Sequence, residues 1–197
     1  MFDCLLRFEV HMAGRASGKR TVYTFAFLYA GASRSLDRAK RDEEGSYYEI
    51  INALVLAAFT LEAYCNHLLE GDELDIELLP KGKDSIWAKY KHIRKALGIP
   101  GAGIENDLPW AARALRFRNL MAHGRTASIE FEEVTTAEPR TSDAYGSVEW
   151  EDFVNVELAS KALEDVEKCI NDFNERAGGG PGPLYCLASG SLIFAED

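Results

Sequence analysis

The sequence predicts a mainly α protein: an antiparallel bundle of about five helices with a β-hairpin inserted before the last helix. Apolar residues recur at intervals of three and four along most of the chain, which is typical of helices that bury one face. Helix start and stop signals divide these segments. Between the predicted helices, about residues 127–152 change to an alternating, strand-like pattern. With 197 residues, 47% of them apolar, the chain is long enough to bury one sizeable core.

Two terminal segments flank the predicted helical domain, which spans residues 22–178. Residues 1–21 form an extension that contains an alternating stretch, LLRFEVHM, and then a Gly-rich, basic break, AGRASGKR. The alternating stretch is either an edge strand or a loosely ordered segment. At the other end, residues 179–197 consist of a flexible spacer, GGGPGP, and an apolar tail that pairs as a strand or stays mobile.

The first helix is predicted over residues 22–43, because its apolar residues follow helical spacing although VYTFAFLY has strand propensity. Gly45 breaks the chain, and Ser46 with Glu49 has the form of a capping box at the start of a second helix. This second helix is apolar nearly all round, so it should be the central element of the bundle. Glu62 and Asn66, one turn apart, are unusual in such a helix.

A third and a fourth helix should follow an acidic linker. Asp84 is the predicted cap of the third helix, and Gly98 its end. Its outer faces carry a set of basic residues: Lys89, Lys91, His92, Arg94 and Lys95. Asp107 and Pro109 mark the start of the fourth helix. Its predicted buried stripe consists of Trp110, Ala114, Phe117 and Met121.

The predicted hairpin rests on two alternating stretches, Ile129–Glu132 and Val148–Glu151, separated by a polar turn region. Asn155 can cap the last helix, which should end at Gly178.

The charge distribution argues against a general nucleic-acid binder, because the chain has a formal net charge of −10. Between Lys81 and Arg125, however, ten basic residues stand against three acidic ones. This segregation suits an anionic ligand held at one place. Solvated helix faces are the other interpretation of the same charges.

Compartment and cofactor signals are sparse. The cysteines, Cys4, Cys65, Cys169 and Cys186, form no CxxC pair, which favours reduced thiols in a cytoplasmic protein. We find neither a signal peptide nor an apolar stretch of the length that spans a membrane. The four histidines form no cluster with metal-ligand spacing, and no Gly-rich phosphate loop precedes a helix, so we expect no metal and no cofactor. The sequence gives equally little support for a catalytic cysteine, since the apolar surroundings of Cys65 are typical of a core residue.

The stretch Arg116–Arg125, RFRNLMAHGR, concentrates cations and a histidine at the end of the fourth helix. Cations in a last helical turn meet the negative end of the macrodipole, and Gly124 could supply a left-handed terminating residue. That structural explanation accounts for one or two of the cations and leaves Arg118 unexplained. Asn119 and His123 lie one turn apart and share a face, whereas Arg118 reaches the same ligand as His123 only if the helix ends at the histidine.

These residues resemble a known family. Arg118-Asn119-Leu120-Met121-Ala122-His123 matches the R-x(4–6)-H motif of the HEPN superfamily, and TLEAYCNHLL, with Glu62 and Asn66, looks like the second helix of that family. The resemblance covers about residues 22–178. It implies a helical bundle that forms a homodimer, with the motif of each chain lining a shared cleft. Many members are metal-independent endoribonucleases, often toxins or defence factors, and others lack the activity.

The chemistry of these groups fits RNA cleavage. His123 can move a proton near neutral pH, and Arg118 can bind phosphate through two parallel hydrogen bonds. Asn119 could position the phosphate or orient the imidazole. Arg113, Arg116 and Arg125 beside the motif are the candidates for binding the RNA backbone, and the product would carry a 2′,3′-cyclic phosphate.

Supporting roles are expected for Glu62 and Asn66 on the second helix. Glu62 either pairs with Arg118 across the helix interface or is an intrahelical or solvated acid.

The sequence departs from the family at one position and leaves one rival function open. Some toxin members carry a tyrosine, modified by an antitoxin, two positions beyond the histidine, where this chain has Arg125. An antitoxin or inhibitor protein acting by that route is therefore not expected, although another kind of inhibitor is compatible with the sequence. The rival function is a non-catalytic dimeric interaction or nucleotide-binding module, in which Arg118 and His123 stabilise the cleft or hold a nucleotide.

Overall fold

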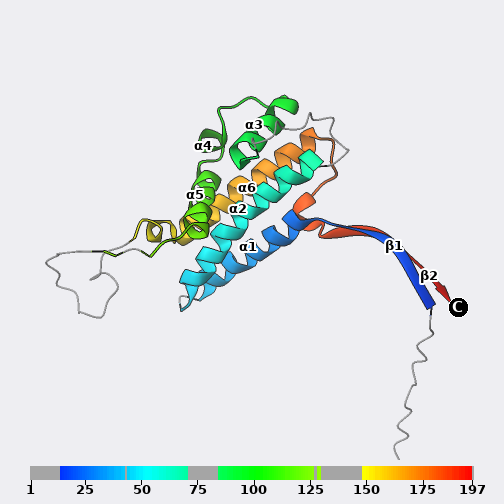
Figure 1. Cartoon of the computed structure of the whole chain (residues 1–197), viewed down its shortest axis with the longest axis horizontal. Helices are drawn as coiled ribbons and strands as arrows, with labels where there is room; N and C mark the ends of the chain where they lie inside the picture. The colour runs from blue at the N-terminus through cyan, green and yellow to red at the C-terminus, as the bar shows by residue number, and fades with distance from the viewer. Residues whose placement is uncertain (1–13, 43, 71–83, 127, 130–147, 197) are drawn as a thin grey trace, which may run out of the picture.

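The computed structural model describes residues 14–42, 44–70, 84–126, 128–129 and 148–196. Within this part the chain is mainly α, with six helices and one two-stranded antiparallel sheet (Figure 1). The helices are α1 Thr24–Arg41, α2 Ser46–Glu70, α3 Ile86–Ala96, α4 Ile104–Asp107, α5 Pro109–Ala122 and α6 Val156–Arg176. The strands are β1 Gly14–Val22 and β2 Ala188–Glu196, and two short 3-10 helices are η2 Glu151–Phe153 and η3 Pro183–Tyr185.

Helix α2 is the centre of the bundle, as predicted, and it packs against α1, α3, α5 and α6. Its inner side chains are fully buried, among them Leu54, Leu61 and Cys65. By length and hydropathy alone α2 would also qualify as a membrane span, but half of the qualifying window is buried inside the bundle. A core helix enclosed by four neighbours needs the same apolar composition.

The predicted starts and ends of the long helices are largely confirmed. Gly45 has a φ of 83°, which only glycine adopts at little cost, and α2 begins directly after it. The Glu49 carboxylate accepts a hydrogen bond from Arg38 of α1 at 3.4 Å. Asn155 caps α6 by accepting from the Leu158 N–H at 2.8 Å.

Helix α3 starts differently from the prediction. The Ser85 hydroxyl, not Asp84, accepts from the Ala88 N–H at 3.3 Å and caps the helix. Arg94, predicted on an outer face, is buried with only 5% of its surface exposed. Burial is possible because Asp107 pairs with its guanidinium.

The predicted β-hairpin before the last helix is wrong where the structure describes it. Most of its first stretch lies outside the described residues, but Val148–Glu151, predicted as a strand, forms a turn that leads into η2. The Glu151 carboxylate accepts from the Val148 N–H at 2.9 Å and closes this turn. Trp150 lies beside Tyr47, with ring centroids 6.3 Å apart. A turn can also place alternate apolar side chains against the bundle, so the alternating pattern did not distinguish a turn from a strand.

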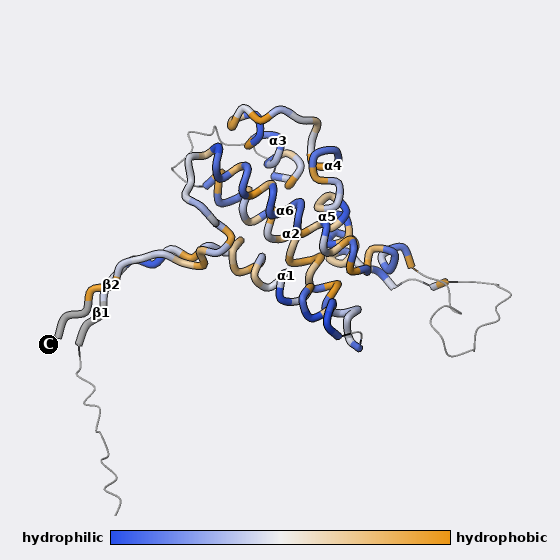
Figure 2. The backbone as a smooth tube through the Cα atoms, turned by 180° about the vertical axis from the view of Figure 1, so that it is seen from behind, coloured by the Kyte–Doolittle hydropathy of each residue, from blue (hydrophilic) through white to orange (hydrophobic). Residues whose placement is uncertain are grey.

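The sheet comes from the two chain ends instead. β1 and β2 pair antiparallel over nine residues, from Gly14 opposite Glu196 to Val22 opposite Ala188. The stretch predicted as a break in the N-terminal extension therefore forms most of a strand, and the C-terminal tail pairs with it. The resulting ribbon projects away from the bundle, as both views show (Figure 1, Figure 2).

The root of the ribbon is attached to the bundle by the start of α1 and by η3. The Tyr23 N–H donates to the Leu187 carbonyl oxygen at 3.0 Å. Tyr29 of α1 and Tyr185 of η3 donate their hydroxyls to the two carboxylate oxygens of Glu167 on α6, at 2.8 and 3.2 Å. Together these bonds attach the segments next to β1 and β2 to each other and to α6.

Candidate functional site: the arginine and histidine of α5

Helix α5 carries the candidate motif, and α6 fixes where this helix begins. Pro109 occupies the first helical position, where a missing N–H costs nothing. The N–H groups of Trp110 and Ala111 both donate to one carboxylate oxygen of Asp165 on α6, at 2.8 and 3.1 Å. This carboxylate satisfies two free amides and faces the positive end of the helix dipole.

The inner face of α5 differs somewhat from the predicted stripe. Ala114 and Phe117 are fully buried, but Trp110 and Met121 are only half-buried. Residues Ala111 and Leu115 take the inner positions in their place. This rotation turns Arg118 toward α2.

Arg118 forms an ion pair with Glu62 of α2. Its Nη2 donates to Glu62 Oε2 at 2.7 Å, and the two side chains are 18% and 27% exposed. Of the two interpretations left open for Glu62, the structure therefore shows the pair across the helix interface. A charge-assisted hydrogen bond at this depth fixes the orientation of the guanidinium more firmly than a bond at the surface.

Phe59 is a further contact of Arg118 that sequence reasoning missed. The guanidinium carbon lies 5.2 Å from the centroid of the Phe59 ring. Phe59 precedes Glu62 by three residues on α2, so helical spacing could have placed the two on one face. The Arg118 Nε is buried and has no hydrogen-bond partner in the described part of the chain. The guanidinium is thus oriented by its neighbours but not saturated by them.

His123 lies at the end of α5, as the motif requires. The last helical residue is Ala122, and His123 follows as the capping residue, with its N–H donating to the Asn119 carbonyl oxygen at 3.1 Å. The side chains of Asn119 and His123 are both exposed. Gly124 does not adopt the predicted left-handed conformation; its N–H donates to the Met121 carbonyl oxygen at 3.3 Å, and this tighter turn ends the helix.

The three other arginines of the predicted site are exposed and differ in their contacts. Arg113 lies over the rings of Trp110 and Phe153, at 5.4 and 5.7 Å from their centroids. Arg116 approaches Glu105 at 3.9 Å, a distance at which solvent screens most of the attraction. Arg125 follows the end of the helix and is exposed. All three leave their charge at the surface of the bundle.

Asn66 does not join the Glu62–Arg118 pair. Its Oδ1 accepts a hydrogen bond from Lys89 of α3 at 2.7 Å. It also lines a cavity of about 290 Å³ with His67 beside the start of α1. This hydrogen bond connects α2 with α3, and the supporting role of Asn66 at the motif stays a prediction.

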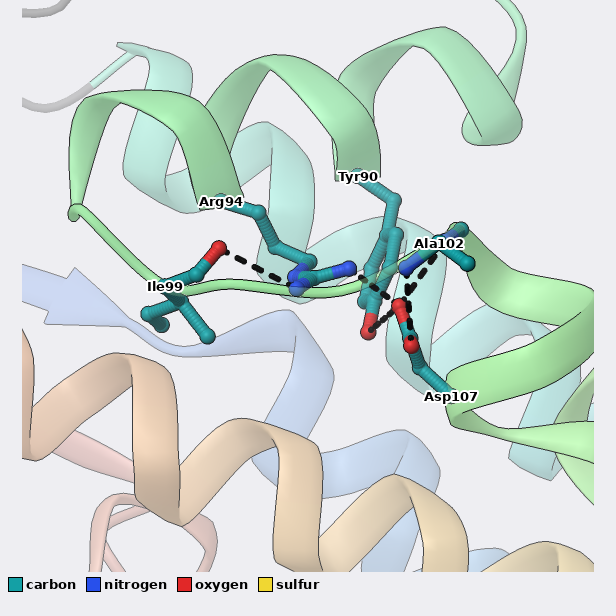
Figure 3. A network of polar contacts seen from close by, with 6 residues as sticks. Tyr90, Arg94, Ile99, Ala102 and Asp107 are labelled. Carbon is teal, nitrogen blue, oxygen red and sulfur yellow. Dashed lines mark hydrogen bonds and ion pairs between the residues drawn. The ribbon is translucent and has the colours of Figure 1, made fainter.

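A polar network ahead of α5 was also missed (Figure 3). The Asp107 carboxylate accepts hydrogen bonds from Arg94, from the Tyr90 hydroxyl at 3.4 Å, and from the N–H groups of Ala102 and Gly103 at 3.2 and 2.9 Å. Arg94 also donates to the Ile99 carbonyl oxygen at 3.1 Å. Asp107 was predicted only as a helix start signal. Its actual partners belong to the preceding loop and to α3, which spacing along α5 cannot reveal.

Two of the three described cysteines, Cys65 and Cys169, are buried, whereas Cys186 is exposed. Burial raises the pKa of the Cys65 thiol to about 12 and raises that of Cys169 well above its ordinary value. Neither is therefore a nucleophile at neutral pH. Among the described residues, no group of three or more histidine, cysteine, aspartate or glutamate side chains could hold a metal ion.

Comparison with protein-family models, with curated proteins and with solved structures finds no match to this chain.

Proposed function

We propose that this protein is a metal-independent endoribonuclease of the HEPN type, in which Arg118 and His123 cleave RNA at a cleft formed by two copies of the chain. The observation that carries the proposal is the Glu62–Arg118 ion pair at 2.7 Å. The family resemblance singled out Arg118 on α5 and Glu62 on α2 separately. The contact between them supports that resemblance.

The pair prepares Arg118 for phosphate. Glu62 occupies one of its N–H donors, and a guanidinium has five. The remaining donors can bind the phosphate oxygens on which negative charge gathers in the transition state. Because Glu62 and Phe59 hold the side chain, less rotational freedom is lost when the phosphate binds.

His123 is suited to proton transfer because it is exposed at the end of α5. As a general base it would take the proton of the ribose 2′-hydroxyl while that oxygen attacks the adjacent phosphorus. The bond from phosphorus to the 5′-oxygen breaks, and that oxygen receives a proton. The products are a 2′,3′-cyclic phosphate and a free 5′-hydroxyl. Asn119 on the same exposed face could hold the phosphate in line.

A homodimer explains how an acidic chain would retain RNA. Glu62 neutralises Arg118, so a single chain offers little net charge at the motif itself. Two motifs facing one cleft would double the number of arginines and histidines near the phosphate. The exposed Arg113, Arg116 and Arg125 of both chains would add positive charge around it.

The test is cleavage of a mixed RNA substrate in EDTA by the wild-type protein and by His123→Ala, with analysis of the 3′ ends. His92→Ala on α3 is the matched control, because it removes a histidine from a helix that does not carry the motif. We expect cleavage by the wild type and the control, cyclic phosphate ends, and loss of activity in His123→Ala. Equal cleavage by His123→Ala, or wild-type protein that is a folded dimer but inert, would overturn the proposal. The second result would favour the non-catalytic binding module.

A further inference from the structure

The pairing register of the terminal ribbon divides its side chains into two chemically different faces. Residues directly opposite each other in an antiparallel pair point to the same face, and successive residues alternate. Lys19 pairs with Ser191, so these two share one face. Arg20 pairs with Gly190, so these two share the other.

The face of Lys19 is rich in hydroxyl groups. Two residues away along β1 it carries Ser17 and Thr21, and Ser189 stands opposite Thr21 on β2. These side chains are all exposed. Lysine and serine or threonine hydroxyls are common partners of phosphate oxygens, which accept hydrogen bonds from both.

The opposite face is shaped by two glycines. A methyl group at Gly18 would overlap the Ser191 carbonyl oxygen, and one at Gly190 would overlap the Lys19 carbonyl oxygen. Only glycine allows the strands to approach so closely at these points. The ribbon encloses a groove of about 450 Å³ whose lining includes Lys19 and Arg20.

The ribbon differs in charge from the rest of the protein. Its two strands contain three basic residues, all in β1, and one acidic residue, Glu196 at the end of β2, whereas the whole chain has a formal net charge of −10. Lys19 and Arg20 are exposed, and neither has an ion-pair partner in the part of the chain that the structure describes. A local positive charge with unpaired donors is complementary to a polyanion.

A protein partner fits the ribbon less well. The large apolar side chains described on it are Val22, Leu192 and Ile193, which are 49%, 75% and 68% exposed. Leu192 and Ile193 are neighbours in β2 and therefore point to opposite faces. Among the side chains that the structure describes on the ribbon, neither face gathers the continuous apolar core of a stable protein interface.

We propose that the β1–β2 ribbon binds the sugar-phosphate backbone of single-stranded RNA, through Lys19 and the hydroxyl groups on one face and through Arg20 on the other. This inference rests on the proposed function, because that function makes RNA the substrate. The ribbon leaves the bundle at the start of α1, whereas His123 lies at the end of α5 (Figure 1). It therefore adds phosphate contacts outside the cleavage site and holds a longer RNA without reading its sequence.

The test measures binding of a fluorescein-labelled single-stranded RNA by anisotropy, with the full chain carrying His123→Ala so that the RNA stays intact. In this background we compare Lys19→Ala/Arg20→Ala with the matched control Lys40→Ala/Arg41→Ala. The control removes the same two charges from exposed positions at the other end of α1. Thermal unfolding confirms that each variant is folded, and sedimentation reports its oligomeric state.

Two lost phosphate contacts should weaken binding by about 25-fold at about 0.1 M salt, and should make the slope of log K against log salt less negative by about 1.4. The control should bind like the parent. Equal affinity of the ribbon variant and the parent overturns the proposal, as does a ribbon variant that changes only the dimer dissociation constant.

The two proposals can fail separately. If the wild type cleaves RNA while the ribbon variant keeps its affinity, the ribonuclease proposal stands and the ribbon proposal fails. If the wild type does not cleave RNA but the ribbon variant loses affinity for RNA, the ribbon proposal stands and the ribonuclease proposal fails.

Discussion

The buried ion pair between Arg94 and Asp107 predicts an asymmetric response to mutation. In Asp107→Ala, the Arg94 guanidinium keeps its charge but loses its carboxylate, in a position where only 5% of the residue is exposed. Removing one partner of a buried pair costs about 3–5 kcal/mol, because an uncompensated charge remains out of water. We therefore expect Asp107→Ala to lower the free energy of unfolding by about 4 kcal/mol.

Arg94→Met should cost less, because it removes the buried charge itself. The Asp107 carboxylate is 23% exposed and keeps the N–H groups of Ala102 and Gly103 as donors. We expect a loss of about 1–3 kcal/mol, from the missing hydrogen bonds and the imperfect packing of the methionine. The double variant Arg94→Met/Asp107→Ala should lose less than the sum of the two single losses, since neither charge is left alone.

Urea denaturation followed by far-ultraviolet circular dichroism measures all three losses, provided that each transition is two-state. The reasoning would be refuted if Asp107→Ala cost no more than Arg94→Met, or if the two losses were additive. Either result would mean that water reaches the guanidinium and screens it.

Three further predictions concern α5 and the core. Glu62→Gln should keep a hydrogen bond to Arg118 but remove the charge that strengthens it, so the guanidinium is oriented less firmly. The kcat/KM for RNA cleavage should therefore fall about tenfold, with a smaller change in the free energy of unfolding. Asp165→Ala removes the acceptor for two N–H groups at the start of α5 and should lower the free energy of unfolding by about 1–2 kcal/mol, measured in urea. Burial raises the pKa of Cys65 to about 12, so the folded chain keeps this thiol protonated while the unfolded chain ionises it above about pH 9. The free energy of unfolding should therefore fall as pH rises from 9 toward 12, by at most about 1.4 kcal/mol per pH unit from this group, and Cys65→Ala should reduce that slope.

Each of these predictions has a control. Glu70→Gln, on the exposed last residue of α2, should leave cleavage unchanged, and an equal loss there would remove the special role of Glu62. Glu164→Ala, next to Asp165 but exposed, should leave stability unchanged within about 0.5 kcal/mol. Cys186→Ala removes an exposed thiol and should leave the alkaline slope intact; a slope that depends on Cys186 instead would contradict the assignment to Cys65.

Helix positions could be predicted from the sequence where local signals act alone. The start of α2 follows Gly45, and the start of α6 follows the Asn155 cap, because both depend on backbone groups a few residues away. The pairing of Glu62 with Arg118 was one of two predicted arrangements. The sequence singled out both residues by their unusual positions and by the family resemblance, but only the packing of α5 against α2 brought the oxygen and the nitrogen to 2.7 Å.

The predictions that failed depended on partners distant in sequence. Arg94 reads as a surface cation because its neighbours in α3 are basic, and its burial follows from a carboxylate thirteen residues away. The residues before α6 alternate like a strand, but a strand needs another strand beside it, and Val148–Glu151 has a turn closed by Glu151. A strand in the C-terminal tail was one of two predicted alternatives, but its pairing with residues 14–22 was not predicted, because each strand is half of a pair whose other half lies at the opposite chain end.

By itself, then, the sequence determined the mainly α class and the central place of α2, and it placed the end of α5 close to His123. These follow from apolar periodicity and from helix start and stop signals, which act within one or two helical turns. The residues of the candidate motif were assigned by resemblance to a family and not by these local signals. Only the tertiary structure decided that Asp165 anchors α5, that Glu62 holds Arg118, that Arg94 is buried, and that the chain ends form one basic ribbon. Each of these contacts joins residues that no local pattern relates, because hydrogen bonds and ion pairs depend on distance in space and not on distance along the chain.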